Sequence, residues 1–249
     1  ISATKQNNQI IPLKVEKVDS YDELLMLAKL KLSHSPLLIQ EFLPGTGHGV
    51  NIMAKAGEIS HYFEYRRLHE PGFGGGSSLR KSVPPNQIIK RQCEKLIQGF
   101  RYSGIGMIEF RFSNSQYFLM EFNARLWGSL SLPIFCGMDF PKILYNHHDY
   151  ISNNYYKPGL TTRNLSKDIK WYMKRRPRSP LFLIYFPIVV SLKIILKKER
   201  LDLEWLNDFM PSLFYYLYSL KRLHDHVYLL SLTIIFSIFK KRYQFECKK

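Results

Sequence analysis

The sequence predicts an α+β protein in which a sheet domain over residues 1–150 is followed by a basic, mainly helical extension over residues 151–249. Two observations lead to this division. Segments with helical and strand periodicity follow one another in mixed order through the first part, as in folds that pack helices on a sheet. The second part instead contains two uncharged runs of 13 residues, each followed by a cluster of basic residues.

The first segments predict a helix between two strands. Residues 10–18 have the composition of a strand. Ser20 and Glu23 have the spacing of a capping box, which opens a helix by pairing its first backbone N–H groups. Residues 36–43 form a largely apolar run that stops at Pro44-Gly45, so we expect a buried strand there.

The next segments predict a hairpin and a second helix. Residues 49–55 and 58–65 flank Ala56-Gly57, which is suited to a tight hairpin turn. Pro84-Pro85 opens a helix that we expect to run to about Tyr102, because proline is tolerated in the first helical turn.

The most informative pattern is a second hairpin, within residues 106–129. Side chains alternate along a strand, so Glu109 lies on one face of the first strand, while Glu121 and Asn123 share one face of the second. A three-residue loop, 114–116, would place Glu109 directly opposite Glu121. Two like charges in this position repel each other unless a cation lies between them. Because Mg²⁺ binds one or two carboxylates together with phosphates and water, the pattern predicts a magnesium–nucleotide site.

This pair of glutamates also has an ordinary interpretation. Half-buried strands carry charges on the face that meets water. A loop of two or four residues would turn Glu109 and Glu121 to opposite faces, unless a β-bulge intervened. The spacing alone leaves both interpretations open.

The net charge of +16 is uneven. Residues 1–150 hold 17 basic and 13 acidic side chains, whereas residues 151–249 hold 19 and 7. Apolar runs followed by basic clusters favour helices on an anionic membrane surface, and we expect peripheral membrane contact through residues 174–249. An ordinary helical packing subdomain is the alternative. The sequence shows no nucleic-acid readout motif, so we expect no specific nucleic-acid partner.

The three cysteines are scattered and lack the spacing of metal ligands. This pattern is typical of a reducing, cytoplasmic setting without a disulfide framework. With the membrane contact above, it predicts a cytoplasmic protein at the inner face of the membrane.

The first 150 residues resemble the C-terminal part of an ATP-grasp domain, the fold of carboxylate–amine ligases and carbamoyl-phosphate-synthase-like enzymes. The resemblance rests on three motifs in order: IQEFLPG, HGVNIMAKAGEI and IEF…FLMEFNARLWGS. It implies an antiparallel sheet with flanking helices. The lysine-bearing strand and glycine-rich phosphate loop that normally open such a domain are not evident, so we expect the chain to be truncated upstream.

The resemblance also implies a set of site residues. Glu109, Glu121 and Asn123 would hold Mg²⁺ or Mn²⁺, and Arg125 would meet a phosphate of ATP. The nucleotide would lie along a hinge segment and the hairpin that follows it, at Gln40, Glu41, Phe42, Leu43 and His48.

A glycine-rich loop over residues 71–78 resembles the family segment that borders the acceptor substrate. It is flanked by Arg66, Arg67 and Arg80, and arginines bind carboxylates or phosphates through two parallel hydrogen bonds. We expect Arg80 to take part in catalysis. A surface loop without a ligand is the alternative.

The expected function is that of an ATP-dependent ligase. Mg-ATP would activate a carboxylate, from a small molecule or from a glycan or peptide precursor, as an acyl phosphate that an amine-type nucleophile then attacks. The sequence holds no credible nucleophile–base set, which fits a reaction driven by positioning and electrostatics. The alternative is a non-catalytic protein that binds a membrane surface or an anionic polymer on a degenerate ATP-grasp scaffold. The sequence does not reveal the oligomeric state.

Overall fold

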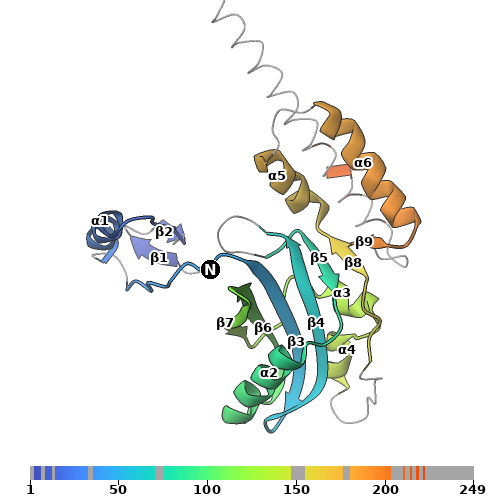
Figure 1. Ribbon diagram of the computed structural model, residues 1–249, viewed down its shortest axis with the longest axis horizontal. Coiled ribbons are helices and arrows are strands. Elements are labelled where there is room, and N and C mark those ends of the chain that lie inside the picture. Colours follow the sequence, from blue (N-terminus) through green and yellow to red (C-terminus); the bar gives the residue numbers. More distant parts are fainter. Residues whose placement is uncertain are drawn as a thin grey trace, which may run out of the picture.

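A seven-stranded sheet dominates the computed structural model (Figure 1). The structure describes residues 3–6, 9–12, 15–32, 36–70, 76–146, 155–175 and 180–202, with single positions 210, 214, 217, 218 and 221. The strand order is β7-β6-β3-β4-β5-β8-β9, and every pair is antiparallel except β8–β9. The strands are β3 (Thr46–Lys55), β4 (Glu58–His69), β5 (Leu79–Ser82), β6 (Gly104–Ser113), β7 (Gln116–Asn123), β8 (Thr161–Arg163) and β9 (Glu199–Leu201).

Helix α2 (Gln87–Gly99) covers one face of this sheet, and α3 (Ser131–Phe135) and α4 (Phe140–Tyr145) cover the other. Helices α5 (Leu165–Arg175) and α6 (Pro180–Ile195) pack against each other. A smaller unit of β1 (Ala3–Gln6), β2 (Gln9–Pro12) and α1 (Tyr21–Leu32) precedes the sheet. The predicted α+β class with an antiparallel sheet and flanking helices is confirmed.

The predicted first helix is confirmed as α1. Ser20 Oγ accepts a hydrogen bond from the backbone N–H of Glu23 at 3.2 Å, which is the expected cap. The Glu23 carboxylate accepts from the N–H of Asp19, one residue before the cap, at 3.1 Å. The strand predicted over residues 10–18 is shorter, since β2 ends at Pro12 and pairs with β1.

The strand predicted over residues 36–43 is wrong. Residues 36–44 have no regular secondary structure, and the side chains of Leu38, Ile39 and Phe42 are exposed. A strand needs a neighbour that pairs its backbone N–H and C=O groups. No strand in the described part of the chain pairs with this segment, so its apolar composition alone does not make it a strand.

The predicted hairpin and second helix are confirmed. Strands β3 and β4 meet at Ala56 and Gly57, which both have positive φ, as a two-residue hairpin turn requires. Helix α2 begins after Asn86, whose side-chain oxygen accepts from the N–H groups of Ile88 and Ile89. Alternating residues of the central strands then supply two separate cores.

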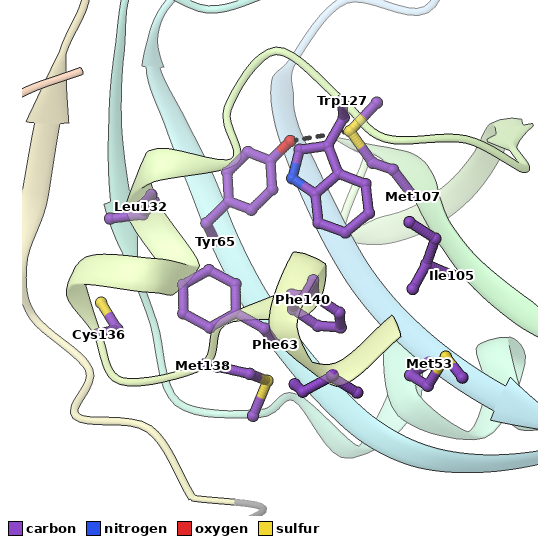
Figure 2. Packing of buried hydrophobic residues seen from close by; sticks show 11 residues of the cluster. Met53, Phe63, Tyr65, Ile105, Met107, Trp127, Leu132, Cys136, Met138 and Phe140 are labelled. Atoms are coloured by element: carbon purple, nitrogen blue, oxygen red, sulfur yellow. Dashed lines mark hydrogen bonds between the residues drawn. The ribbon is translucent and has the colours of Figure 1, made fainter. Parts of the chain in front are cut away.

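One core lies between the sheet and α3 and α4. Figure 2 shows Phe63 and Tyr65 of β4 facing Trp127, Met138 and Phe140. The opposite face packs against α2, with Val50, Ile52, Ile108 and Phe110 under Ile89, Cys93 and Ile97. A third cluster joins α5 to α6 through Leu165, Ile169, Phe186 and Val190.

The part of the chain after residue 150 contributes β8 and β9 to the same sheet. Among the described residues, no helix is long and apolar enough to span a membrane.

His48 is buried on the same face of the sheet as α2. It is the cross-strand partner of Arg66 and Phe110, and its Nδ1 lies 3.9 Å from a carboxylate oxygen of the buried Glu64, which is too far for a hydrogen bond. Burial, and next the charge of Arg66, lower the pKa of His48 to about 4, although Glu70 raises it. His48 is therefore neutral in the folded protein at pH 7.

We expect Gly49→Ala to destabilise the sheet. A Cβ at Gly49 would lie 2.5 Å from Cε1 of Tyr65 and closer still to the ring hydroxyl, and Tyr65 is packed in the core. Such overpacking costs about 1–3 kcal/mol of unfolding free energy, to be measured by urea denaturation. Gly99→Ala is the control, because nothing lies within 4 Å of a Cβ there. Equal stability of both variants would contradict this packing.

We expect His48→Gln to change how stability depends on pH. The folded protein holds His48 below its ordinary pKa, so the unfolded chain binds the proton more readily. Stability is thus fully present above about pH 6.5 and falls as the pH drops toward 4, by about 3 kcal/mol. The difference in unfolding free energy between wild type and His48→Gln should change by that amount across this range. A constant difference from pH 7 to 4 would show that His48 is not held neutral.

Candidate active site

The two predicted metal-binding glutamates face each other across β6 and β7. Glu109 is the cross-strand partner of Glu121, as predicted. The route is different, because the loop has two residues, Asn114 and Ser115, both with positive φ. An extra residue in β7, Met120, restores the pairing, since Glu109 pairs with Glu121 while the next residue of β6 pairs with Leu119. Of the alternatives that the sequence left open, the structure therefore has the two-residue loop, with a β-bulge that keeps both glutamates on one face.

Asn123 and Arg125 join this pair through side-chain hydrogen bonds. Asn123 Nδ2 donates to Glu121 Oε1 at 2.7 Å. Arg125 donates from one nitrogen to Asn123 Oδ1 and from another to the carbonyl of Leu126, both at 3.1 Å. Arg125 and Glu121 are exposed at the edge of the sheet. The structure therefore brings all four residues of the Glu…Glu-x-Asn-x-Arg pattern together.

Arg67 of β4 is an additional member of the site. Its guanidinium forms an ion pair with Glu109 Oε1, and a second nitrogen lies 3.6 Å from Glu70 Oε1. The Arg67 side chain is 9% exposed, and its Nε has no partner among the described residues. Burial opposes the charge of Arg67, but Tyr65, Glu109 and Glu70 outweigh it and raise its pKa. Arg67 is therefore a permanent buried cation beside Glu109.

Glu70 connects the site to the end of the hinge segment. Its carboxylate accepts from the N–H of Gly47 at 3.1 Å and from Arg111 at 2.8 Å. The same Arg111 nitrogen donates to the carbonyl of Gly45 at 3.1 Å. Gly47 has to be glycine here, because a Cβ would collide with the carboxylate of Glu70 and lie 2.7 Å from Cδ of Arg67.

Burial and the neighbouring charges change the pKa of Glu109. Its side chain is 15% exposed, and burial raises its pKa. Arg67 lowers the pKa of Glu109, whereas the nearby Glu121 and Glu70 raise it. An additional positive charge near Glu109 and Glu121 would relieve their repulsion.

The other predicted residues are placed differently. Gln40, Glu41 and Phe42 are exposed and Leu43 is half-buried, in the segment that leads to Gly45. His48 lies on the opposite face of the sheet from Glu109, because Glu109 pairs with the next residue of β3. The structure does not bring His48 to the carboxylates, and the nucleotide contacts of these five residues stay predictions.

Arg80 lies on the same face as Arg67, its cross-strand partner, but it has its own protein partners. It forms an ion pair with Asp202 and donates to Thr162 Oγ1 at 3.2 Å and to the carbonyl of Ser77 at 3.4 Å. Its side chain is buried. A catalytic role for Arg80 stays a prediction. Residues 71–75 of the glycine-rich loop lie outside the described residues.

The side chains of Glu109, Glu121 and Asn123 fit a magnesium ion that is also bound to the phosphate groups of a nucleotide. The described part of the chain contains no group of three or more His, Cys, Asp or Glu side chains able to enclose a metal. Mg²⁺ does not require such a group, because it is usually held by one or two carboxylates and by phosphate oxygens. Glu109 and Glu121 would supply the carboxylates, and the Asn123 amide oxygen would be a further ligand of the kind that Mg²⁺ accepts.

The sequence placed Arg67 beside the glycine-rich loop but did not predict its ion pair with Glu109, and it gave no role to Glu70. The alternation of side chains along β4 places Arg67 on the same face as Tyr65. The sequence could therefore have predicted on which face of the sheet Arg67 lies. It could not have pointed to Glu70, because the extra residue Leu68 forms a bulge that changes the register after Arg67.

The comparisons with known proteins support the resemblance to an ATP-grasp domain. Residues 33–167 match the family model described as ATP-grasp in the biosynthetic pathway with Ter operon. No curated protein shows significant similarity to the chain. Solved structures with similarity include an L-amino acid ligase from Bacillus licheniformis, with 14% identity over 64% of this chain and 42% of that one, and a TM-score of 0.46.

Two further solved structures show similarity. A D-alanine–D-alanine ligase from Bacillus anthracis complexed with ATP shares 14% identity over 54% of this chain and 50% of that one, with a TM-score of 0.39. The biotin carboxylase domain of a thermophilic 2-oxoglutarate carboxylase bound to bicarbonate shares 12% identity over 57% and 34%, with a TM-score of 0.43. The chain thus spans half or less of these proteins. Because the family model covers more than half of the sequence, the chain belongs to this ATP-grasp family.

Proposed function

We propose that the chain is the phosphate-binding part of an ATP-dependent ligase that activates a carboxylate as an acyl phosphate. The observation that carries this proposal is the register of β6 and β7, which places Glu109 opposite Glu121 with Asn123 and Arg125 attached. Membership of the ATP-grasp family supports it.

The reaction begins when a substrate carboxylate oxygen attacks the γ-phosphorus of ATP, and the bond to the ADP oxygen breaks. An amine-type nucleophile then attacks the acyl carbon, and phosphate leaves. Both reactants of the first step are anions, so charge neutralisation and alignment supply most of the catalysis. A bound Mg²⁺ supplies positive charge at the phosphate oxygens.

The side chains divide this work. Glu109, Glu121 and Asn123 would hold the cation, and the exposed guanidinium of Arg125 would donate to a phosphate oxygen. Gln40 to Leu43 would hold the adenine end of the nucleotide. Arg80 and the glycine-rich loop would border the substrate, a small-molecule carboxylate or a glycan or peptide precursor. We expect this ATP-dependent reaction to take place in the cytoplasm. Cys93 and Cys136 are free and buried, which agrees with a reducing compartment.

We expect Glu109→Gln combined with Glu121→Gln to lower Mg²⁺-dependent ATP turnover in the full-length protein about a hundredfold or more. Both amides keep the shape of the carboxylates but remove the charges that hold the cation. Turnover is measured as phosphate release, and thermal unfolding shows whether the variant is folded.

The control is Glu58→Gln, which removes an exposed carboxylate from the far end of β4. It should keep the activity of the wild type. Undiminished turnover in the double variant would exclude the proposed metal site.

A second candidate function, peripheral binding to an anionic membrane, is favoured by the surface of α6. Its buried side contacts α5 through Phe186 and Val190. Ile188, Leu192 and Ile195 are exposed at helical spacing, and Lys193, Lys197 and Lys198 are exposed beside them. Apolar side chains next to basic ones are typical of helices at a membrane surface.

We expect replacement of Lys193, Lys197 and Lys198 by glutamine to lower binding to phosphatidylserine vesicles, by about 1 kcal/mol per lysine near the surface. Co-sedimentation with vesicles measures the bound fraction, and phosphatidylcholine vesicles are the control. These changes are preferable to deletion of residues 174–249, which would also remove β9 and the Asp202 partner of Arg80. Equal sedimentation of variant and wild type would exclude these lysines as a membrane contact.

A further inference from the structure

We propose that Arg67 is an internal counter-ion that competes with the divalent cation for Glu109. In the nucleotide-free protein the guanidinium neutralises the carboxylate, and it has to give up this contact, or share it, when the cation binds. This inference rests on the proposed metal site at Glu109 and Glu121, and it adds a residue that sets the affinity of that site.

The Arg67 charge lies close to the place that the cation would occupy. Its ion pair with Glu109 uses a carboxylate that faces Glu121 directly across the strands. A cation shared by Glu109 and Glu121 would therefore lie within a few ångströms of the guanidinium, and two positive charges at this distance repel each other strongly in a partly buried site.

Arg67 keeps its positive charge inside the site when a cation binds. Its side chain is buried, and its stem lies against Gly47, so it does not turn out into solvent. A guanidinium does not lose its proton at neutral pH. The positive charge is thus a fixed part of the site, unlike the charge of the exposed Arg125 on Asn123.

The Arg67 guanidinium has a second acceptor nearby. Glu70 lies 3.6 Å from the nitrogen that does not contact Glu109, and Nε has no partner among the described residues. Arg67 can therefore move its hydrogen bonds toward Glu70, or toward a phosphate, without becoming a buried unpaired cation. When a cation binds Glu109, the Arg67 guanidinium can thus pair with Glu70 instead.

A positioning role would have the opposite signature. A side chain that merely orients a metal ligand strengthens metal binding, and its removal typically weakens affinity by about 10–100-fold. Removal of a competing cation strengthens the binding instead. The sign of the change in metal affinity thus distinguishes a counter-ion from a positioning residue.

The experiment measures Mn²⁺ binding to the full-length, nucleotide-free protein by electron paramagnetic resonance. Arg67→Gln should bind Mn²⁺ about tenfold more tightly than the wild type, because the competing charge is gone. Arg66→Gln is the matched control, since Arg66 is the adjacent residue of the same type, is exposed, and faces His48 on the other side of the sheet. It should bind Mn²⁺ with the affinity of the wild type.

A second readout covers the case in which Arg67→Gln does not fold without metal. Arg67→Met keeps an apolar stem against Gly47, and Mn²⁺ should raise its unfolding temperature more than that of the wild type. Unchanged or weaker Mn²⁺ binding by the Arg67 variants would overturn the counter-ion role. The proposed function fails in a separate way, when Glu109→Gln with Glu121→Gln binds Mn²⁺ as the wild type does.

Discussion

The bulge at Met120 is the constraint on which the rest of the candidate site depends. In an unbroken register Glu109 would pair with Met120, and Glu121 would turn to the face that α2 covers. The extra residue returns Glu121 and Asn123 to the face of Glu109. Bulges often redirect side chains next to active sites, and here the redirection creates a pair of like charges that the folded chain has to neutralise.

The opposing charges come from arginine side chains, the buried Arg67 and the half-buried Arg111. Arg67 pairs with Glu109, and Arg111 pairs with Glu70. Buried ion pairs add little to stability compared with apolar packing, but loss of one partner leaves an uncompensated charge that costs about 3–5 kcal/mol. The four charges thus have to be kept as a set. A sheet that needed only stability would be better served by apolar residues at these positions, and the charges agree with the metal site proposed for Glu109 and Glu121.

Local signals in the sequence predicted the parts of the fold that local interactions determine. Ala56 and Gly57 reverse the chain, and Ser20 caps α1, because these residues satisfy turn and cap geometry by themselves. The predicted strand at residues 36–43 was wrong, since a strand depends on its neighbour. The sequence left open whether a three-residue loop or a bulge would pair Glu109 with Glu121, because a bulge depends on the packing of the whole sheet. Arg80 shows the same limit, because its partner Asp202 is distant in sequence.

The hinge segment and the carboxylates are held to each other by charges and backbone hydrogen bonds. Arg111 binds the carbonyl of Gly45, and Glu70 binds the N–H of Gly47 as well as Arg111. Glu70 is also the second acceptor near Arg67. In the proposed function the adenine and the phosphates occupy the two ends of this network, so their separation is determined by the same residues that balance the charge of Glu109. Catalysis by positioning requires such a fixed separation. A change of charge at Glu109 would therefore alter the contacts of Arg67 and Glu70, and through Glu70 the contacts that hold the hinge segment. The proposed adenine and phosphate positions thus depend on the same charged residues.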